Sequence, residues 1–287
     1  KCQRFNESLD QDGDVFIAGY PFQRSRILFE MDPTLYESAF NDFAEEDYGS
    51  LKQVVFDEFP ACIAYNLRLA ERGEGSSDPV RKLLHMKDTW EAVIFVLYAL
   101  VMGEIRYRGI DLTEARVFSH YDPSGNPQCK PFTSDMLLSD ALKSKLHNIK
   151  GIIQFCKASK LGFKLEKIDE TLPDDLLQLQ DIRNDMSHHA TPTREQAQTE
   201  LVQVMPIFRE MLFKTRFLED CRVLRFESYS SQCRCEIFNG HSLNREFDNF
   251  SFQPPQISYI LILGQEQLFV QWGDDCFSLS PFLHFER

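Results

Sequence analysis

The chain has 287 residues, of which 43% are hydrophobic, enough to form one large domain or two smaller ones with a sizeable core. Its 44 Asp and Glu outnumber 31 Lys and Arg, and the net charge of −13 excludes a broad electrostatic grip on nucleic acid. The longest apolar run, residues 92–102, is about half the roughly 20 residues that cross a bilayer, so no membrane contact is expected.

Residues 1–78 are expected to form an N-terminal α/β extension. Segments 14–20 and 26–30 have strand-like composition and predict a small hairpin or a sheet edge. The apolar pattern from 33 to 72 is helical, with a break at Pro60. The glycine- and serine-containing stretch 71–78 is the best linker candidate.

Residues 79–220 are expected to form a bundle of helices. The first should open with Asp78 as its cap and Pro79 in its first turn. The prolines and glycine of residues 109–132 exclude a long helix and predict an inserted loop. The second helix should span about 134–160, the third 173–190, and a capping box over 193–196 should open the fourth.

The second of these helices carries a modest basic face. Its members are Lys143, Lys145, His147 and Lys150. The face is either solvated or useful for RNA phosphates, and the solvated interpretation is favoured.

Residues 221–287 are expected to form a small antiparallel accessory sheet packed on the helices. Five runs have strand-like composition: 223–229, 233–238, 257–263, 268–272 and 276–279. Four aromatic residues on them are expected to pack in a core or an interface, with base stacking as the alternative: Phe226, Tyr229, Phe269 and Trp272. The fold class predicted for the whole chain is therefore α+β and mainly α.

The eight cysteines show neither a paired C-x-x-C spacing nor a zinc-type histidine cluster, so free thiols in a reducing cytoplasm are expected. The acidic stretch 10–14 has Val15 and Pro21 where a calcium loop needs glycine and glutamate. No metal and no cofactor are therefore expected. The chain opens at Lys1 without methionine or a recognisable signal peptide, so a fragment of a longer protein with an upstream domain is an open alternative.

Functional residues concentrate in the third helix, where Arg183 and Asn184 are followed by His188. Asn184 and His188 are four apart and point away from the apolar stripe of that helix, while Arg183 lies at its edge. Histidine exchanges protons near neutral pH, and the arginine fork fits phosphate oxygens. Together they fit metal-free phosphodiester cleavage in which a ribose 2′-hydroxyl attacks phosphorus, so the substrate would be RNA.

The same residue types are also ordinary occupants of an exposed helix face. A cation in the last turn of a helix favours the negative end of its dipole, and the spacing of arginine and histidine arises often by chance. A solvated helix end is therefore the alternative interpretation of these residues.

The run Arg183-Asn184-x-x-x-His188 resembles the R-polar-x(3–5)-H motif of HEPN domains (higher eukaryotes and prokaryotes nucleotide-binding), found in many ribonuclease toxins and defence effectors. Residues 79–220 reproduce the family's helix order, with the motif on the third long helix. The resemblance implies a homodimer with a composite, metal-independent site that leaves a cyclic phosphate and a 5′-hydroxyl. It also implies a toxin or antiviral role.

On this resemblance His188 is the general acid or base, Arg183 binds the scissile phosphate and Asn184 orients the substrate or the histidine. The helper candidates are Asp185, Ser187, His189, which also fits the looser family spacing, and Glu91, which would orient Arg183. For Glu91, pairing with a structural arginine or exposure at the helix rim is the alternative. The competing hypothesis for the chain is a non-catalytic dimerisation, nucleotide-sensing or protein-interaction module with a regulatory partner.

Overall fold

The computed structural model describes residues 14–17, 20–23, 31–139, 141–160, 162, 164–187, 192–227, 232–242, 246–251 and 267–283. Helices dominate the described residues, and the strands pair antiparallel, so the predicted mixed and mainly helical class is confirmed at that level. The chain divides into two compact units, residues 1–54 and 55–287.

The first unit contains a hairpin in which β1 (Asp14–Ile17) pairs with β2 (Tyr20–Gln23). The sequence predicts a hairpin here, but with its second strand at 26–30. The observed second strand comes earlier, and residues 26–30 lie outside the described part of the chain.

The long helix α3 (Pro33–Glu58) begins in the first unit and ends in the second. Asp32 accepts a hydrogen bond from the Leu35 backbone N–H at 3.0 Å, which satisfies one donor of the first turn. The helix stops before Pro60, and α4 (Ala61–Arg72) begins directly after it. The predicted break is confirmed, because Pro60 has an extended ψ of 133° that no helix interior allows.

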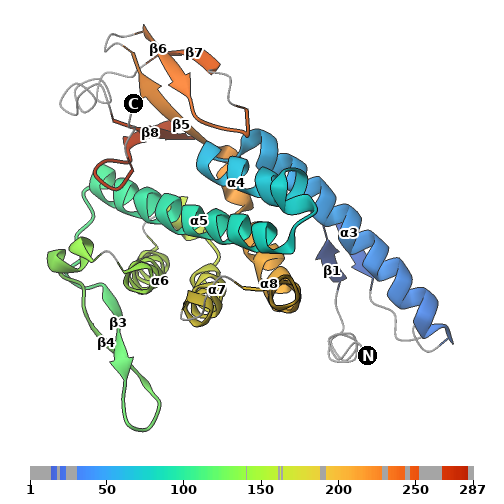
Figure 1. Cartoon of the computed structure of the whole chain (residues 1–287). Coiled ribbons are helices and arrows are strands. Elements are labelled where there is room, and N and C mark those ends of the chain that lie inside the picture. Colours follow the sequence, from blue (N-terminus) through green and yellow to red (C-terminus); the bar gives the residue numbers. More distant parts are fainter. Residues whose placement is uncertain are drawn as a thin grey trace. The chain divides into compact units, whose positions relative to one another are not determined.

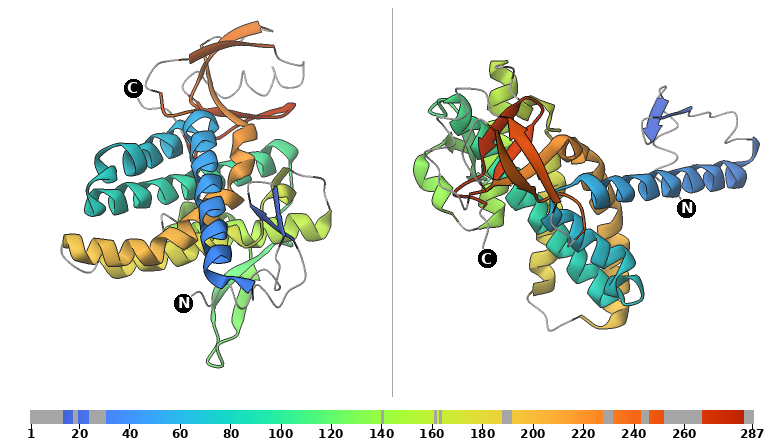
Figure 2. Two further views of the ribbon diagram at one scale, coloured as in Figure 1. Left: turned by 90° about the vertical axis from the view of Figure 1, so that its right-hand side faces the viewer. Right: turned by 90° about the horizontal axis from the view of Figure 1, so that it is seen from above.

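The second unit is built around α5 (Pro79–Arg108), which contacts α4, α6 (Leu142–Ser159), α7 (Leu172–Ser187) and α8 (Arg194–Lys214). Helices α6, α7 and α8 lie side by side along α5 (Figure 1). Figure 2 shows the same helices from two further directions.

Local capping chemistry fixes where α5 and α8 begin. The Asp78 carboxylate accepts the Val80 N–H at 3.0 Å, with Pro79 in the first turn of α5. Thr193 and Gln196 form a reciprocal capping box at the start of α8. Both starts are confirmed, and each cap is worth about 1 kcal/mol.

The segment between α5 and α6 is a hairpin instead of the predicted loop. β3 (Arg116–Tyr121) pairs with β4 (Pro127–Pro131), and the hairpin extends away from the helices (Figures 1 and 2). Prolines exclude a helix, but they are tolerated at the ends of an edge strand, where no ladder hydrogen bond is lost. The base of the hairpin is closed by the Phe132 N–H, which donates to the Ala115 carbonyl at 2.9 Å.

Helix α6 starts at Leu142, later than the predicted residue 134, and a 3₁₀ turn covers Ser134–Leu138. Side chains from α6 reach back to this turn and its end: Asn148 donates to the Met136 carbonyl at 3.3 Å, and Lys145 donates to the Ser139 carbonyl at 2.8 Å. The Met136 carbonyl also accepts the Ser139 backbone N–H at 3.4 Å, so these carbonyls are satisfied without an α-helix through this segment.

The C-terminal part forms an antiparallel sheet in the order β7-β6-β5-β8-β9. Its strands are β5 (Cys221–Phe226), β6 (Gln232–Ile237), β7 (Glu246–Ser251), β8 (Phe269–Trp272) and β9 (Asp275–Ser278). Strand β7 is missing from the prediction, and the predicted strand 257–263 lies outside the described residues. Phe226, Phe269 and Trp272 are buried, so core packing is confirmed for these three aromatics; Tyr229 is not among the described residues.

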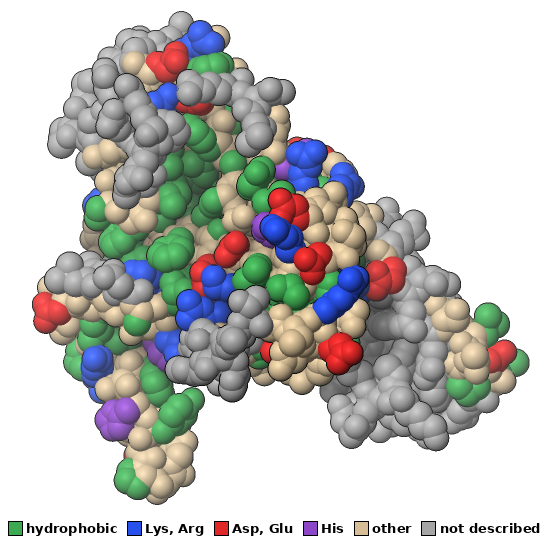
Figure 3. All heavy atoms as spheres, in the orientation of Figure 1, with side chains coloured by type: hydrophobic (Ala, Val, Ile, Leu, Met, Phe, Trp, Pro, Cys, Tyr) green, Lys and Arg blue, Asp and Glu red, His purple; other side chains and the backbone are tan. Residues whose placement is uncertain are grey.

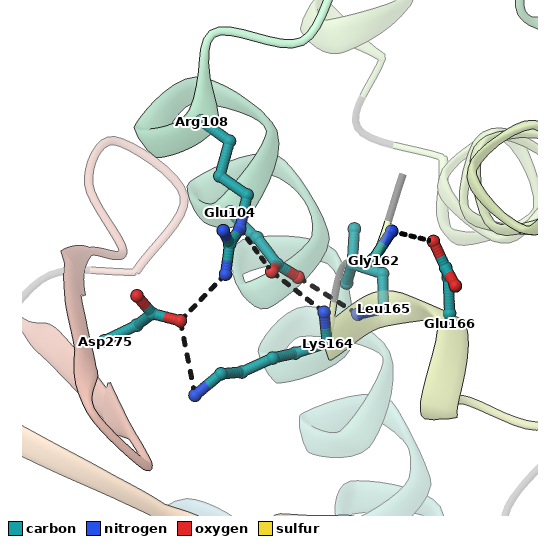
Figure 4. Close-up of polar contacts among 7 residues, drawn as sticks. All are labelled: Glu104, Arg108, Gly162, Lys164, Leu165, Glu166 and Asp275. Atoms are coloured by element: carbon teal, nitrogen blue, oxygen red, sulfur yellow. Dashed lines mark hydrogen bonds and ion pairs between the residues drawn. The ribbon is translucent and has the colours of Figure 1, made fainter. Parts of the chain in front are cut away.

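The sheet is joined to α5 by a buried polar network (Figure 4). The Glu104 side chain is fully buried and pairs with Arg108 Nε at 2.9 Å. Its carboxylate also accepts the backbone N–H groups of Lys164 and Leu165, each at 3.0 Å. Arg108 and Lys164 then both reach Asp275 of β9, at 2.8 and 3.3 Å. One carboxylate therefore ties α5 to the segment before α7 and, through two cations, to the sheet, which packs on the helices as the sequence predicts.

Candidate functional site

The motif region lies at the C-terminal end of α7. Asp174 and Asp175 occupy the first turn of this helix, where negative charge is favourable. Leu176 and Leu179 are fully buried, which confirms the core-facing part of the predicted stripe. The described helix ends at Ser187, whereas the prediction carried it to residue 190.

Arg183 is held beside α5 by an ion pair with Glu91. Arg183 Nε lies 3.4 Å from Glu91 Oε1, and the two side chains are 35% and 20% exposed. The pair therefore sits at a helix–helix boundary that solvent reaches. Glu91 thus contacts Arg183 itself, which is the contact that its suggested helper role needs.

Glu91 is shared with a second cation. Lys87, one turn earlier on α5, places Nζ 3.5 Å from Glu91 Oε2 and 3.4 Å from Asp88 Oδ1. The sequence interpretation missed Lys87, although its i,i+4 spacing to Glu91 is a recognisable signal for a helical ion pair. Two cations and two carboxylates thus form one charged group between α5 and the end of α7.

Large apolar side chains flank this charged group on the same face of α5. Leu84 and Phe95 are 44% and 40% exposed, and positions 84, 88, 91 and 95 follow steps of four, three and four residues, which places them on one helix face. Figure 3 shows charged side chains interleaved with hydrophobic ones in the middle of the visible face. The surface around Arg183 is therefore amphipathic.

The remaining motif residues are placed only in part. Asn184, Asp185 and Ser187 belong to α7, but their side chains are not among those described. His188 and His189 lie outside the described residues. The structure therefore brings Arg183 and Glu91 together and leaves the positions of both histidines to be inferred from helical spacing.

Two lysines of the basic face predicted for α6 form ion pairs with α7 at the protein surface. Lys143 is ion-paired with Asp181, and Lys150 Nζ lies 2.7 Å from Asp174 Oδ1. These two ion pairs show that α6 and α7 run antiparallel. The start of α6 therefore lies beside the end of α7 that carries Arg183. Neither alternative considered from the sequence, solvation or RNA binding, included this use of the lysines.

His147 of α6 also turns toward the protein. Its ring packs against the Phe118 ring of β3, with centroids 4.3 Å apart. Burial, reinforced by nearby Lys150 and Lys143, lowers the pKa of His147. A neutral imidazole stacked on an aromatic ring serves packing at physiological pH.

Among the described residues, no group of three or more His, Cys, Asp or Glu side chains is arranged to hold a metal ion. No helix in the same part of the chain has the length and apolar character needed to span a membrane.

The chemistry available at the site is phosphate binding by a solvent-accessible guanidinium that a carboxylate orients. A proton-transferring group must come from elsewhere in the motif. Comparison with known proteins adds no assignment: no protein-family model, no curated protein and no solved structure matches this chain.

Proposed function

We propose that this chain is a metal-independent endoribonuclease of the HEPN type that acts as a homodimer. The observation that carries the proposal is the Arg183–Glu91 ion pair at 3.4 Å. It positions the motif arginine at a partly exposed junction of two helices, with its orientation set from a second helix. A purely solvated arginine at a helix end would need no such partner.

The proposed reaction transfers a phosphoryl group within the RNA. A neutral histidine, assigned to His188, removes the proton of the ribose 2′-hydroxyl as that oxygen attacks phosphorus. The O2′–P bond forms while the P–O5′ bond breaks, and the 5′ oxygen takes up a proton from a second acid. Arg183 balances the negative charge that grows on the phosphate oxygens. The products are a 2′,3′-cyclic phosphate and a 5′-hydroxyl.

A homodimer would supply the second acid, because each copy contributes one His188. The exposed Leu84 and Phe95 beside the charged group favour this arrangement, since large apolar side chains at an interface centre provide much of the binding free energy. A two-fold axis through this face would bring like residues of both copies together.

The test is cleavage of single-stranded RNA in the presence of EDTA. The wild-type protein is expected to cut RNA and to leave cyclic-phosphate ends, and Arg183→Ala is expected to remove most of the activity. Arg68→Ala is a matched control, because Arg68 is an exposed arginine on α4. Activity that needs a divalent metal, or that survives in Arg183→Ala at the wild-type rate, contradicts the proposal.

Glu91 gives a further prediction as a positioning residue. Glu91→Gln keeps the side-chain volume but removes the negative charge, so Arg183 should lose its fixed orientation. Cleavage should slow by about tenfold, since mispositioning of a catalytic group costs on this scale or more, while KM changes little. Glu114→Gln, at an exposed glutamate outside this charged group, is the control. An unchanged kcat in Glu91→Gln would limit Glu91 to a structural role.

A second candidate function is a non-catalytic interaction module. The specific observation in its favour is charge: the chain carries −13, and Lys143 and Lys150 of α6 are engaged by α7 carboxylates. A net acidic chain in which Lys143 and Lys150 already pair with carboxylates favours a protein or nucleotide partner over a long polyanion. Binding of such a partner without any RNA turnover would support this alternative.

A further inference from the structure

We propose that the hairpin of β3 and β4 is an RNA-binding arm that holds substrate beside the motif end of α7. This inference rests on the proposed function for its choice of ligand. The arm is defined as residues Arg116–Pro131, which comprise both strands and their turn.

The arm is rigidly anchored at its base. Val117 is only 1% exposed, and Phe118 packs on His147. Gly151 lets the arm approach α6 closely, because a Cβ at this position would lie 2.3 Å from the Arg116 carbonyl oxygen. Backbone-to-backbone contact of this kind leaves the base little freedom to move.

The tip of the arm is also ordered, although it is exposed. One Asp122 carboxylate oxygen accepts the backbone N–H groups of Ser124 and Asn126 at 2.9 and 2.8 Å, and the other accepts the Gln128 amide at 3.1 Å. These hydrogen bonds, with that to the backbone of Asn126 contributing most, lower the pKa of Asp122. The single carboxylate of the arm is thus committed to shaping the turn.

The side chains that face solvent suit an unpaired nucleic acid strand. Tyr121 is 65% exposed, and its ring lies 4.9 Å from that of Phe118. Arg116 is exposed, and the strand register places it on the face of the hairpin that carries Phe118 and Tyr121. Lys130 is also exposed, but it pairs with Val117 and lies on the other face. Exposed aromatic rings stack on bases, and nearby cations bind the phosphates between them.

The net charge of the arm is opposite in sign to that of the whole chain. The arm carries Arg116 and Lys130 against Asp122, a net charge of +1 (2 − 1), whereas the whole chain carries −13. A local positive segment in an acidic protein attracts a polyanion to that place. This agrees with the net charge of the chain, which excludes a broad contact with nucleic acid.

The direction of the arm connects it to the candidate site. β3 passes Gly151 at Arg116 and His147 at Phe118, so it runs toward the start of α6. One helical turn further, about 6 Å, Lys143 pairs with Asp181 of α7. Asp181 lies two residues before Arg183, so the arm and the motif share one end of the helices. RNA bound to the arm would therefore lie near Arg183.

The test measures binding separately from cleavage. The probe is fluorescein-labelled single-stranded RNA with 2′-O-methyl groups, which block attack by the 2′ oxygen, in a fluorescence anisotropy titration over a series of salt concentrations. Tyr121→Ala should weaken binding about tenfold, in line with the loss of one stacked base. Arg116→Gln should lower the salt slope by about 0.7, the value for one lost phosphate contact on a single strand.

Matched controls lie away from the arm. Tyr65→Ala on α4 removes a tyrosine that is 39% exposed, and Lys167→Gln removes an exposed lysine; both should bind like the wild type. Arm variants that bind RNA normally overturn the proposal, as does a wild type that binds no RNA. The proposal is also overturned if the only effect of the arm substitutions is to dissociate a dimer, because the arm would then contact a second copy of the chain instead of RNA.

The results also separate this inference from the proposed function. RNA binding that depends on Tyr121 without any cleavage of unmodified RNA would retain the arm and refute the ribonuclease. Cleavage whose KM is unchanged in the arm variants would retain the ribonuclease and refute the arm.

Discussion

His188→Ala is expected to slow RNA cleavage by about 10² to 10⁴-fold, the usual contribution of a general acid or base. In the sequence His188 is four residues after Asn184, the spacing on which the assignment of the acid–base role rests, whereas His189 is five residues after it. His189→Ala should therefore cost much less. Single-turnover cleavage rates of both variants, at equal folded fraction and equal dimer content, provide the measurement.

The controls for this prediction concern assembly as much as chemistry. Sedimentation of each variant must show the same oligomer as the wild type, because a composite site is lost when copies separate. If His189→Ala reduces the rate by the larger factor under these conditions, the assignment of His188 is wrong and the looser motif spacing applies.

Glu104→Ala is expected to lower the free energy of unfolding by about 3–5 kcal/mol, the range for removing one partner of a buried ion pair. The Glu104 side chain is fully buried against Arg108, and it accepts two backbone N–H groups that would otherwise be unsatisfied. Urea unfolding followed by circular dichroism measures the change.

Two further variants show which part of the Glu104 contact matters. Glu104→Gln keeps an oxygen acceptor and should lie between the wild type and Glu104→Ala. Glu114→Ala, at an exposed glutamate after the same helix, should stay within about 0.5 kcal/mol of the wild type. A Glu104→Ala protein as stable as Glu114→Ala would mean that the network in Figure 4 contributes little.

Features with local causes could be predicted from the sequence. The cap at Asp78 with Pro79, the break at Pro60 and the capping box at Thr193 each depend on residues within one turn, and the structure has all three. Strand β7 could not be found in the same way. Its Glu246, Asp248 and Asn249 are types depleted in strands, and its pairing with β6 is a tertiary effect.

In the candidate site, too, the residues could be recognised from the sequence, but the contacts that depend on tertiary packing could not. The sequence suggested that Glu91 orients Arg183, yet it could not show that they meet, because they are 92 positions apart (183 − 91) and only the packing of α7 on α5 brings them to 3.4 Å. For the α6 lysines, composition indicated positive charge, but the α7 carboxylates that engage Lys143 and Lys150 become neighbours only in the folded chain.

The closed base of the arm also bears on how such a protein can diversify. Because Phe132 donates to the Ala115 carbonyl, the two strands leave and rejoin the helical part at neighbouring points. Insertions or deletions at the exposed turn around Gly125 would therefore leave the path from α5 to α6 unaltered. Selection or protein engineering can therefore change the length of this hairpin while the helices that carry Arg183 stay as they are.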